Sequence, residues 1–252
     1  MSNQPDASHA GGTLFLIPNT LGKRDEADPL PDVIPAGVQQ IAARLDYLVA
    51  ENAKTARAFL KKLGETAPLA RPIQQIEIRE LNVNTRAEAL ADLLEPIRAG
   101  RDGGLLSEAG VPAVADPGAD LVRLAHAAGV RVRPLVGPSS ILLAVMGSGL
   151  NGQSFAFNGY LPVDPGERAQ KLRELEQHSR KTRQTQVWIE TPYRNGALLE
   201  AMRQHCAGTT LLSIAVDLTQ PGETIVTLPL SAWRPERLEL HKRPAIFSLL
   251  AA

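Results

Sequence analysis

Three short segments of this chain combine glycine, proline and small polar residues in a way that suits ligand binding. They are residues 18–22 (PNTLG), 107–118 (SEAGVPAVADPG) and 137–140 (GPSS). Glycine lets a ligand approach backbone groups closely, and the third segment precedes an expected helix whose free N–H groups would suit a carboxylate or phosphate. Each segment alone also fits an ordinary turn. The three together predict a ligand site.

Familiar cofactor and catalytic motifs do not account for these segments. The sequence has no G-x-x-x-x-G-K-[ST] phosphate loop, no G-x-G-x-x-G after an expected strand and no G-x-S-x-G turn around a nucleophilic serine. Its five histidines have no metal-ligand spacing, so we expect no metal site. The single cysteine, Cys206, lacks an expected activating partner and is interpreted as a buried, inert thiol.

The three segments are expected at the carboxyl ends of strands, because strand-like and helix-like runs alternate in the first half of the chain. Expected strands are residues 13–17, 46–50, 73–81, 103–107 and 130–136. Expected helices are residues 54–63, 85–99, 120–128 and 139–148, the second opened by a capping box of Thr85 and Glu88. This alternation predicts a parallel sheet with helices on both faces, and such sheets bind ligands at their carboxyl edge.

The second half of the chain has a different rhythm. Strands are expected at residues 155–161, 186–189, 211–216, 224–228 and 245–250, and helices at residues 167–183 and 195–205. Consecutive strands without a helix between them predict a mixed, partly antiparallel sheet. Glycine and asparagine at residues 149–153 indicate a domain boundary. We therefore expect an α/β protein with a disordered tail (1–12), an N-terminal α/β domain (13–150) and a C-terminal α/β domain (151–252).

Composition restricts the class of protein further. The 252 residues are 44% hydrophobic, and 27 Lys plus Arg balance 27 Asp plus Glu. The net charge is therefore zero and gives no indication of a nucleic-acid partner. The N-terminus lacks the build of a signal peptide, and the most apolar run, residues 141–146, is too short to cross a bilayer. With one cysteine, the chain is expected in the reducing cytoplasm and away from membranes.

The order of these segments resembles the ribosomal RNA small-subunit methyltransferase I family, in the tetrapyrrole-methylase class of S-adenosylmethionine-dependent enzymes. SEAGVP and ADPG are similar to that family's S-D-A-G-T-P and N-D-P-G. LFLIPNTLG resembles its first strand and P-T-P-I-G-N loop, and LVAENAKTARAFLKKLG resembles its segment with A-E-D-T-R. Three further segments follow in the family's order. They are FAFNGYLP, VWIETPYRNGALLEAM (family F-Y-E-S-x-H-R) and AVDLTQPGETIVTLPL (family A-R-E-L-T-K-x-x-E). The resemblance therefore covers about residues 13–230.

The resemblance implies a two-domain, tetrapyrrole-methylase-like fold with a parallel-sheet N-terminal domain, a mixed-sheet C-terminal domain and S-adenosylmethionine in the cleft between them. It also implies a homodimer. Backbone groups of the loops would contact adenine and ribose, and Glu108 would accept from ribose hydroxyls or from the ammonium group. The implied donor contacts are Pro18, Asn19, Leu21, Glu108, Gly110, Pro112, Ser139, Ser140, Ile189, Glu190 and Thr191.

The sequence departs from the family pattern at several motif positions. Glu108 and Val111 stand for the family's Asp and Thr, and A-E-N-A-K replaces A-E-D-T-R. W-I-E-T-P-Y-R replaces F-Y-E-S-x-H-R, and residues 242–244 (KRP) replace a C-terminal K-G-E. Three functions stay open: ribose 2′-O-methylation of ribosomal RNA as in the family, methylation of a small molecule such as a tetrapyrrole, and non-catalytic donor binding.

Methyl transfer to a hydroxyl needs positioning and a base for the departing proton. Glu190, Glu51 and Lys54 are candidate bases, although each also fits an ordinary ion-paired or solvated role, so the catalytic residue stays unassigned. The implied partner is ribosomal RNA or the small ribosomal subunit. The expected helix at residues 167–183 is rich in basic residues, and two interpretations of it are equally expected: a basic face that binds RNA and an ordinary solvated helix. The basic residues are Arg168, Lys171, Arg173, Arg180, Lys181 and Arg183, and Arg234, Arg237, Lys242 and Arg243 would add to a basic face.

Overall fold

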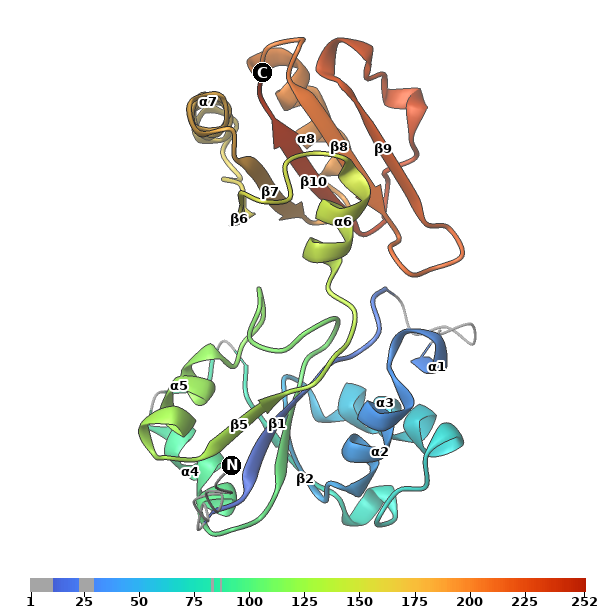
Figure 1. The fold of residues 1–252 in the computed structure, drawn as a ribbon, viewed down its shortest axis with the longest axis vertical. Helices are drawn as coiled ribbons and strands as arrows, with labels where there is room; N and C mark the ends of the chain where they lie inside the picture. The colour runs from blue at the N-terminus through green and yellow to red at the C-terminus, as the bar shows by residue number, and fades with distance from the viewer. Residues whose placement is uncertain (1–10, 23–29, 83, 87) are drawn as a thin grey trace, which may run out of the picture. The chain divides into compact units, whose positions relative to one another are not determined.

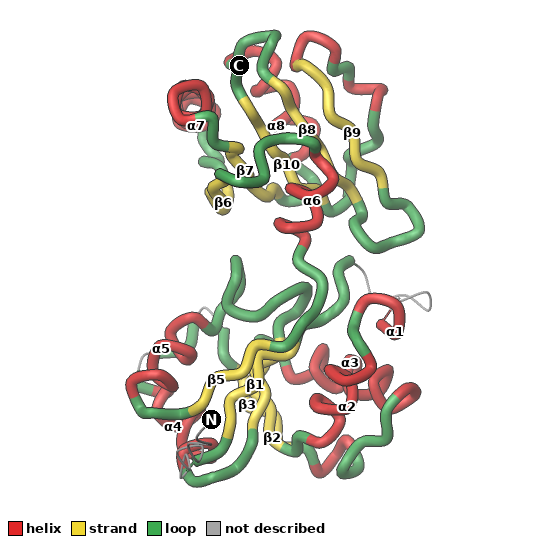
Figure 2. The backbone as a smooth tube through the Cα atoms, in the orientation of Figure 1, coloured by secondary structure: helices red, strands yellow, loops and turns green. Residues whose placement is uncertain are grey.

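A computed structural model describes residues 11–22, 30–82, 84–86 and 88–252. The chain forms two compact units (Figure 1). Within the described residues, unit 1 comprises residues 11–20 and 30–138, and unit 2 comprises residues 21–22 and 139–252. Each unit contains one sheet flanked by helices (Figure 2), which confirms the expected α/β class.

Unit 1 is built on a parallel sheet in the order β3-β2-β4-β1-β5. The strands are β1 (Thr13–Ile17), β2 (Tyr47–Ala50), β3 (Glu77–Glu80), β4 (Gly103–Leu106) and β5 (Arg131–Pro134). β1 lies between β4 and β5, with Ile17 opposite Leu106 and Leu16 opposite Pro134. This register brings the loops that follow β1, β4 and β5 to one edge of the sheet, as the sequence predicts.

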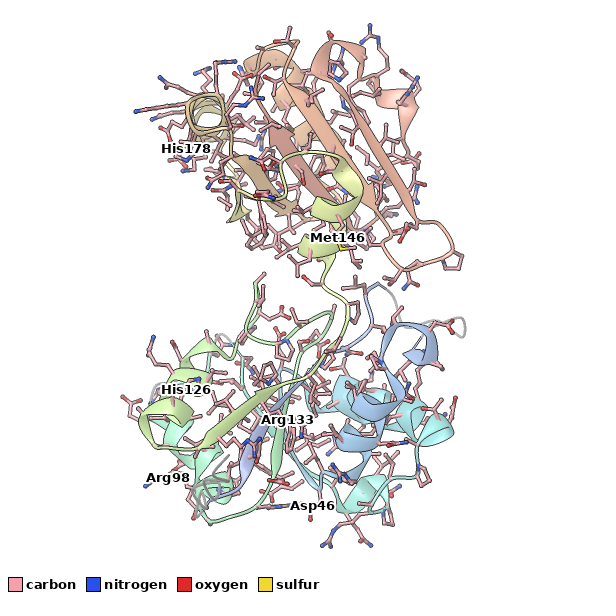
Figure 3. All side chains as sticks on the ribbon, viewed as in Figure 1. Asp46, Arg98, His126, Arg133, Met146 and His178 are labelled. Carbon is pink, nitrogen blue, oxygen red and sulfur yellow. The ribbon has the colours of Figure 1, made fainter. Side chains whose placement is uncertain are left out.

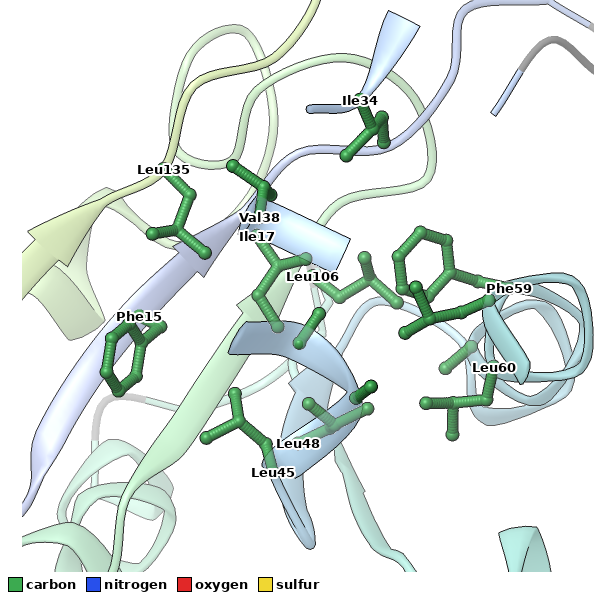
Figure 4. Packing of buried hydrophobic residues seen from close by; sticks show 14 of the residues in the cluster. Phe15, Ile17, Ile34, Val38, Leu45, Leu48, Phe59, Leu60, Leu106 and Leu135 are labelled. Atoms are coloured by element: carbon green, nitrogen blue, oxygen red, sulfur yellow. The ribbon is translucent and has the colours of Figure 1, made fainter. Parts of the chain in front are cut away.

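Helices cover both faces of this sheet, because successive strand residues point to opposite sides. One face packs on α1 (Leu30–Val33), α2 (Ala36–Arg44) and α3 (Ala53–Thr66), and the other on α4 (Ala89–Arg98) and α5 (Ala119–Ala127). Phe15, Ile17 and Leu48 belong to the first core (Figure 4), and Leu14 and Tyr47 to the second. Burial raises the pKa of Tyr47 to about 12. The parallel sheet covered on both faces is confirmed.

Unit 2 holds a mixed sheet in the order β6-β7-β10-β8-β9, in which β6 and β7 are parallel and the other neighbouring pairs antiparallel. The strands are β6 (Phe155–Tyr160), β7 (Thr185–Glu190), β8 (Leu211–Val216), β9 (Thr224–Pro229) and β10 (Ala245–Leu250). α7 (Pro165–Thr182) and α8 (Asn195–His205) cover one face, where Trp188 and Phe247 are fully buried. α6 (Ser140–Ser148) packs on the other face and leaves Met146 exposed (Figure 3).

The division between the units falls after Pro138, whereas the sequence placed it at residue 150. The difference is helix α6, in which Ile141 and Val145 are buried in one cluster with Ile246 of β10. The period of an apolar helix shows which of its faces is buried, and it cannot show which sheet buries that face. Gly149, expected near the boundary, ends α6 in the left-handed conformation with φ 68°.

Several local expectations differ from the structure. The helix expected from Thr85 begins at Ala89, because the Thr85 hydroxyl accepts from the backbone N–H of Asn82 and closes a turn before the helix. Residues 73–75 form a 3₁₀ turn, as do residues 230–232 and 235–237. α1 and α2 were not expected, since prolines interrupt their pattern. Of the expected tail, residues 1–10 lie outside the described residues, whereas Gly12 is buried and donates to the Ile97 carbonyl at 2.8 Å.

Helix α4 contains a proline, Pro96, which has no N–H to donate to the Asp92 carbonyl one turn earlier. Arg79 of β3 supplies the missing donor, with its Nη1 2.7 Å from the Asp92 oxygen. The same guanidinium pairs with Glu77 at 2.8 Å. An arginine from the neighbouring strand therefore satisfies the backbone group that the proline leaves open.

No helix in the described ranges combines the length and the apolar character that a membrane crossing requires. The most apolar run, residues 141–146, lies within α6, which has nine residues. A membrane-spanning helix needs about 20.

Arg101 ties together the starts of three elements of unit 1. Its guanidinium donates to the Asp46 carboxylate at 2.8 Å and to the Glu77 carboxylate at 2.6 Å, and lies 5.1 Å from the centre of the Tyr47 ring. Hydrogen bonds from Arg101 lower the pKa values of Asp46 and Glu77 below their ordinary 3.8 and 4.5. Because both pKa values are lowered, this stabilisation is present above the ordinary values and is lost as pH falls through the folded ones.

Replacing Arg101 by Gln is expected to lower the free energy of unfolding at neutral pH by about 1–2 kcal/mol, the size of a lost hydrogen bond to a charged group. The deficit should shrink in acid, at about pH 3, where both carboxylates take up protons. Urea unfolding at the two pH values measures it. Arg123→Gln is the control, since Arg123 pairs with Asp120 on the exposed surface. A deficit of equal size at both pH values would rule out the electrostatic origin.

Candidate functional site

The loops that follow β1 and β4 are joined at the carboxyl edge of the sheet in unit 1. Asn19 donates its backbone N–H to the Gly110 carbonyl at 2.8 Å and accepts from the Gly110 N–H at 3.2 Å. Its buried side chain donates to the carbonyls of Ser107 and Glu108 at 3.0 and 3.1 Å, and accepts from the Thr20 N–H at 2.9 Å. The polar groups of Asn19 are therefore satisfied within the protein, and they hold the two loops together.

Glycines and prolines fit the same loops against one another. Pro18 and Pro112 are buried, and a side chain at Gly137 would overlap the Pro18 ring. Gly110 has φ 69° and Gly118 has φ 126°, and residues that carry a side chain rarely adopt such conformations. These residues set the path of the backbone at the edge of the sheet, as both the turn interpretation and the ligand interpretation of the sequence require.

Three carboxylates gather at this edge from positions far apart in the sequence. Glu51 follows β2, Glu108 follows β4, and Asp116 lies further along the loop after β4. Burial, and after it the charges of Glu51 and Glu108, raises the pKa of Asp116 to about 6. Burial, and after it the charge of Glu108, also raises the pKa of Glu51. We call these three residues the acidic edge; such mutual repulsion is frequent where a protein binds a cation or transfers a proton.

The acidic edge suits an organic cation better than a metal ion. Within the part of the chain that the structure describes, no group of three or more His, Cys, Asp or Glu side chains is placed to hold a metal. The Thr55 hydroxyl donates to the Glu108 carboxylate and fixes it from the side of α3. An ammonium or sulfonium group needs negative charge nearby without a converging ligand set, and the acidic edge supplies it.

The segment that resembles A-E-D-T-R forms the start of α3. Asn52 is the N-cap, and its side chain accepts from the backbone N–H groups of Lys54 at 2.8 Å and Thr55 at 3.3 Å. Asn52 thus fills a capping position that an aspartate fills equally well. Of the two candidate bases here, Glu51 belongs to the acidic edge, whereas Lys54 is exposed.

Unit 2 carries other predicted donor contacts. Leu21 is buried in the apolar cluster beneath α6, and Ile189 of β7 belongs to the same cluster. Ser139 is the N-cap of α6, with its hydroxyl accepting from the Leu142 N–H at 3.4 Å, and Ser140 is the first helical residue. The structure therefore places these predicted residues at the start of α6 and beneath it, and the first N–H groups of this helix could donate to an anion.

Glu190 ends β7 inside an ion pair, with its side chain 1% exposed. Arg194 donates to its two carboxylate oxygens at 2.6 and 2.7 Å, and the Thr191 N–H donates to it at 2.6 Å. These contacts shape the turn between β7 and α8. A third candidate base is thus engaged in holding this turn.

The basic run of α7 takes part in contacts within unit 2. Arg180 lies 3.6 Å from Glu176, and Lys171 lies 3.9 Å from Glu174. Lys181 is exposed near the end of the helix. Figure 3 labels His178 on the same helix. Local pairs of this kind are typical of a solvated helix, and they reduce the charge left for a partner.

Asp116 of the acidic edge and Thr55, which donates to Glu108, were not predicted as site residues. Asp116 lies in the predicted ligand segment 107–118 and Thr55 in the segment that resembles the family's A-E-D-T-R, but neither is among the predicted donor contacts or candidate bases. The acid in the turn D-P-G was the available signal. Its significance depends on the fold, because only the parallel sheet places it beside Glu51 and Glu108.

Comparison with known proteins relates this arrangement to a family. The Tetrapyrrole (Corrin/Porphyrin) Methylases match residues 30–233. The ribosomal RNA small subunit methyltransferase I of Pseudomonas aeruginosa is 28% identical over 222 residues, which are 88% of this chain and 72% of that protein. Its counterpart in Neisseria meningitidis serogroup B is 30% identical over 220 residues, which are 87% and 68% of the two chains.

Solved structures agree on the fold. The methyltransferase CobJ matches with a TM-score of 0.60 and 18% identity, over 96% of this chain and 100% of that one. At such identity the likeness concerns the fold alone, whereas the sequence matches span both units. The chain belongs to the tetrapyrrole methylase family and, within it, to the ribosomal RNA small subunit methyltransferase I family of methyltransferases.

Proposed function

We propose that this chain transfers a methyl group from S-adenosylmethionine to ribosomal RNA of the small subunit. Its relatives bear that function in their names. The observation in this structure that supports the proposal is the acidic edge, where burial and, after it, neighbouring carboxylates raise the pKa values of Glu51 and Asp116. S-adenosylmethionine carries positive charge on its sulfonium and its ammonium, so the acidic edge would favour it over the product, whose sulfur is neutral.

The loops at the acidic edge fit the remaining parts of the donor. Asn19 acts by holding the loops after β1 and β4 together, because its backbone and its side chain are both engaged within the protein. Pro18, Gly110 and Pro112 contribute backbone groups that adenine and ribose can approach, and the Glu108 carboxylate can accept from ribose hydroxyls. In unit 2, contacts at Leu21, Ser139, Ser140, Ile189, Glu190 and Thr191 stay predictions.

The protein has two tasks in methyl transfer to a ribose hydroxyl. Bound S-adenosylmethionine supplies an electrophilic methyl group, whose bond to sulfur breaks as its bond to oxygen forms. The loops align the two reactants and exclude water. A base takes the hydroxyl proton, and a base is most effective when its pKa lies near the working pH. Asp116 and Glu51, whose pKa values are raised, suit that task better than Glu190, which is held by Arg194.

A second candidate function is methylation of a small molecule such as a tetrapyrrole. The balanced charge of the chain, 27 basic against 27 acidic residues, favours it, because most RNA-binding proteins carry a positive excess. The ion pairs along α7 point the same way. The two functions share the donor and differ in the acceptor, so one assay can separate them.

Purified protein, incubated with labelled S-adenosylmethionine and undermethylated small ribosomal subunits, is expected to place label on the RNA. If the acceptor is a ribose 2′-oxygen, the labelled linkage will resist alkaline hydrolysis, since the attacking hydroxyl is blocked. A parallel reaction with a tetrapyrrole tests the second function. Label on the tetrapyrrole alone, under conditions in which the Pseudomonas aeruginosa relative labels the same subunits, would overturn the proposal.

Binding of the cationic donor should strengthen as pH rises through about 6, because Asp116 then becomes ionised. Asp116→Asn is expected to weaken binding at about pH 8 by threefold to tenfold, roughly one charge interaction near a surface, and to flatten the pH dependence. Calorimetric titration with S-adenosylmethionine measures both. S-adenosylhomocysteine should respond less, and Asp120→Asn, on the exposed surface of α5, should match the parent protein. An unchanged pH profile in Asp116→Asn would refute this role.

We also propose, from the family resemblance, that the chain forms a homodimer and works in the cytoplasm, where its proposed substrate is found. Light scattering on the purified protein should give twice the chain mass of 27.1 kDa. A mass of one chain across the micromolar range would contradict the dimer and leave the methyltransferase proposal intact.

A further inference from the structure

A groove in unit 2 lies directly beyond the predicted donor segment at the end of β7. The turn after β7, the first half of α8 and residues 235–241 enclose a cavity of about 220 Å³. Pro192, Leu199 and Leu238 contribute apolar walls. A space of this size with apolar walls can accept one flat ring system and little more.

Tyr193 stands at this groove with 72% of its surface exposed. Its ring meets the His241 imidazole edge to face, with centroids 6.1 Å apart and planes at 81°. The Lys242 ammonium lies 6.0 Å from the centre of the same ring. Exposed aromatic rings of this kind are the platforms on which proteins stack unpaired nucleobases.

The fold holds these three side chains in place from behind. The Lys242 N–H donates to the Pro192 carbonyl at 3.1 Å, which ties the loop after residue 240 to the turn after β7. The fully buried Asn195 donates to the carbonyls of Leu240 and Arg243 at 3.1 and 2.8 Å. The groove is therefore preorganised, and a ligand would bind without first ordering the loop.

Two carboxylates, Glu200 and Glu239, line the groove and are exposed. Arg203 donates to Glu200 at 2.8 Å, and the backbone N–H of His241 donates to Glu239 at 2.8 Å. A carboxylate in the groove disfavours a phosphate and favours an uncharged base, because it can accept a hydrogen bond from the amino group of the base. Lys242 is exposed and its ammonium lies beside the Tyr193 ring, from where it can reach a phosphate next to a base stacked on that ring.

We propose that this groove binds one unpaired nucleobase of single-stranded RNA, stacked on Tyr193, while Lys242 contacts a neighbouring phosphate. The proposal rests on the proposed function in RNA methylation and names a substrate contact outside α7. Bases in a duplex are already stacked on one another, so the groove selects for unpaired RNA.

The test uses a fluorescent single-stranded RNA decamer and fluorescence anisotropy with the full-length protein. Tyr193→Ala is expected to weaken binding about tenfold, the contribution of one base stack, whereas Tyr193→Phe keeps the ring and should bind within about twofold of the parent. Tyr160→Ala is the matched control, because Tyr160 is an exposed tyrosine of the same unit, at the end of β6. Duplex RNA of the same sequence should bind more weakly than the single strand.

Lys242→Gln separates the phosphate contact from the stack. The slope of log affinity against log salt concentration should fall by about 0.7, the value for one phosphate contact on a single strand. Lys61→Gln, an exposed lysine on α3, should leave the slope unchanged. Circular dichroism before each titration confirms that the variants are folded, as expected for substitutions at exposed positions.

The inference about the groove fails if Tyr193→Ala binds RNA like the parent, if Tyr160→Ala loses as much, or if the parent does not bind the decamer. Methyl transfer then separates the groove from the proposed function. RNA binding that depends on Tyr193 without transfer to ribosomal RNA would uphold the groove and overturn the proposed function. If Tyr193→Ala transfers methyl groups to RNA with the same KM as the parent, the proposed function is upheld and the inference about the groove is overturned.

Discussion

The candidate site depends on the parallel pairing of β1 with β4. Most of the sequence of unit 1 separates these strands, yet their register sets Ile17 opposite Leu106, so that the loops after them begin side by side. Asn19 fixes the two loops relative to each other. Its backbone pairs with the backbone of Gly110, and its side chain donates to the carbonyls of Ser107 and Glu108. The positions of Glu108 and of the glycine-rich backbone follow from that join.

The two edges of this sheet treat carboxylates in opposite ways. At the amino ends of the strands, Asp46 and Glu77 are hydrogen-bonded to Arg101, and their pKa values are lowered. At the carboxyl ends, burial and, after it, the charge of Glu108 raise the pKa values of Glu51 and Asp116. The first arrangement stabilises the fold, whereas the second stores repulsion that a cationic ligand would relieve. This contrast within one sheet supports the proposal that the carboxyl edge binds the methyl donor.

Unit 2 uses its polar side chains differently. The buried pair of Glu190 and Arg194 fixes the turn after β7, and Asn195 fixes the loop that faces that turn. Between these rigid supports, Tyr193 stays exposed. A polar framework that is satisfied internally thus presents one aromatic ring, which is the arrangement expected of a binding surface built on a stable scaffold.

The sequence by itself determined the alternation of strands and helices, the parallel sheet followed by a mixed sheet, and the order of motifs that indicates the family. These features follow from local periodicity and from the turn residues that end each element. The starts of α1, α2 and α4 were not predicted correctly, because the proline and capping residues there are compatible with a turn as well as with a helix start. Only the tertiary structure decided that α6 packs on the second sheet, that Asp116 joins Glu51 and Glu108, and that Glu190 is held by Arg194. Strand order and packing between distant segments produce these contacts, and no local pattern records them.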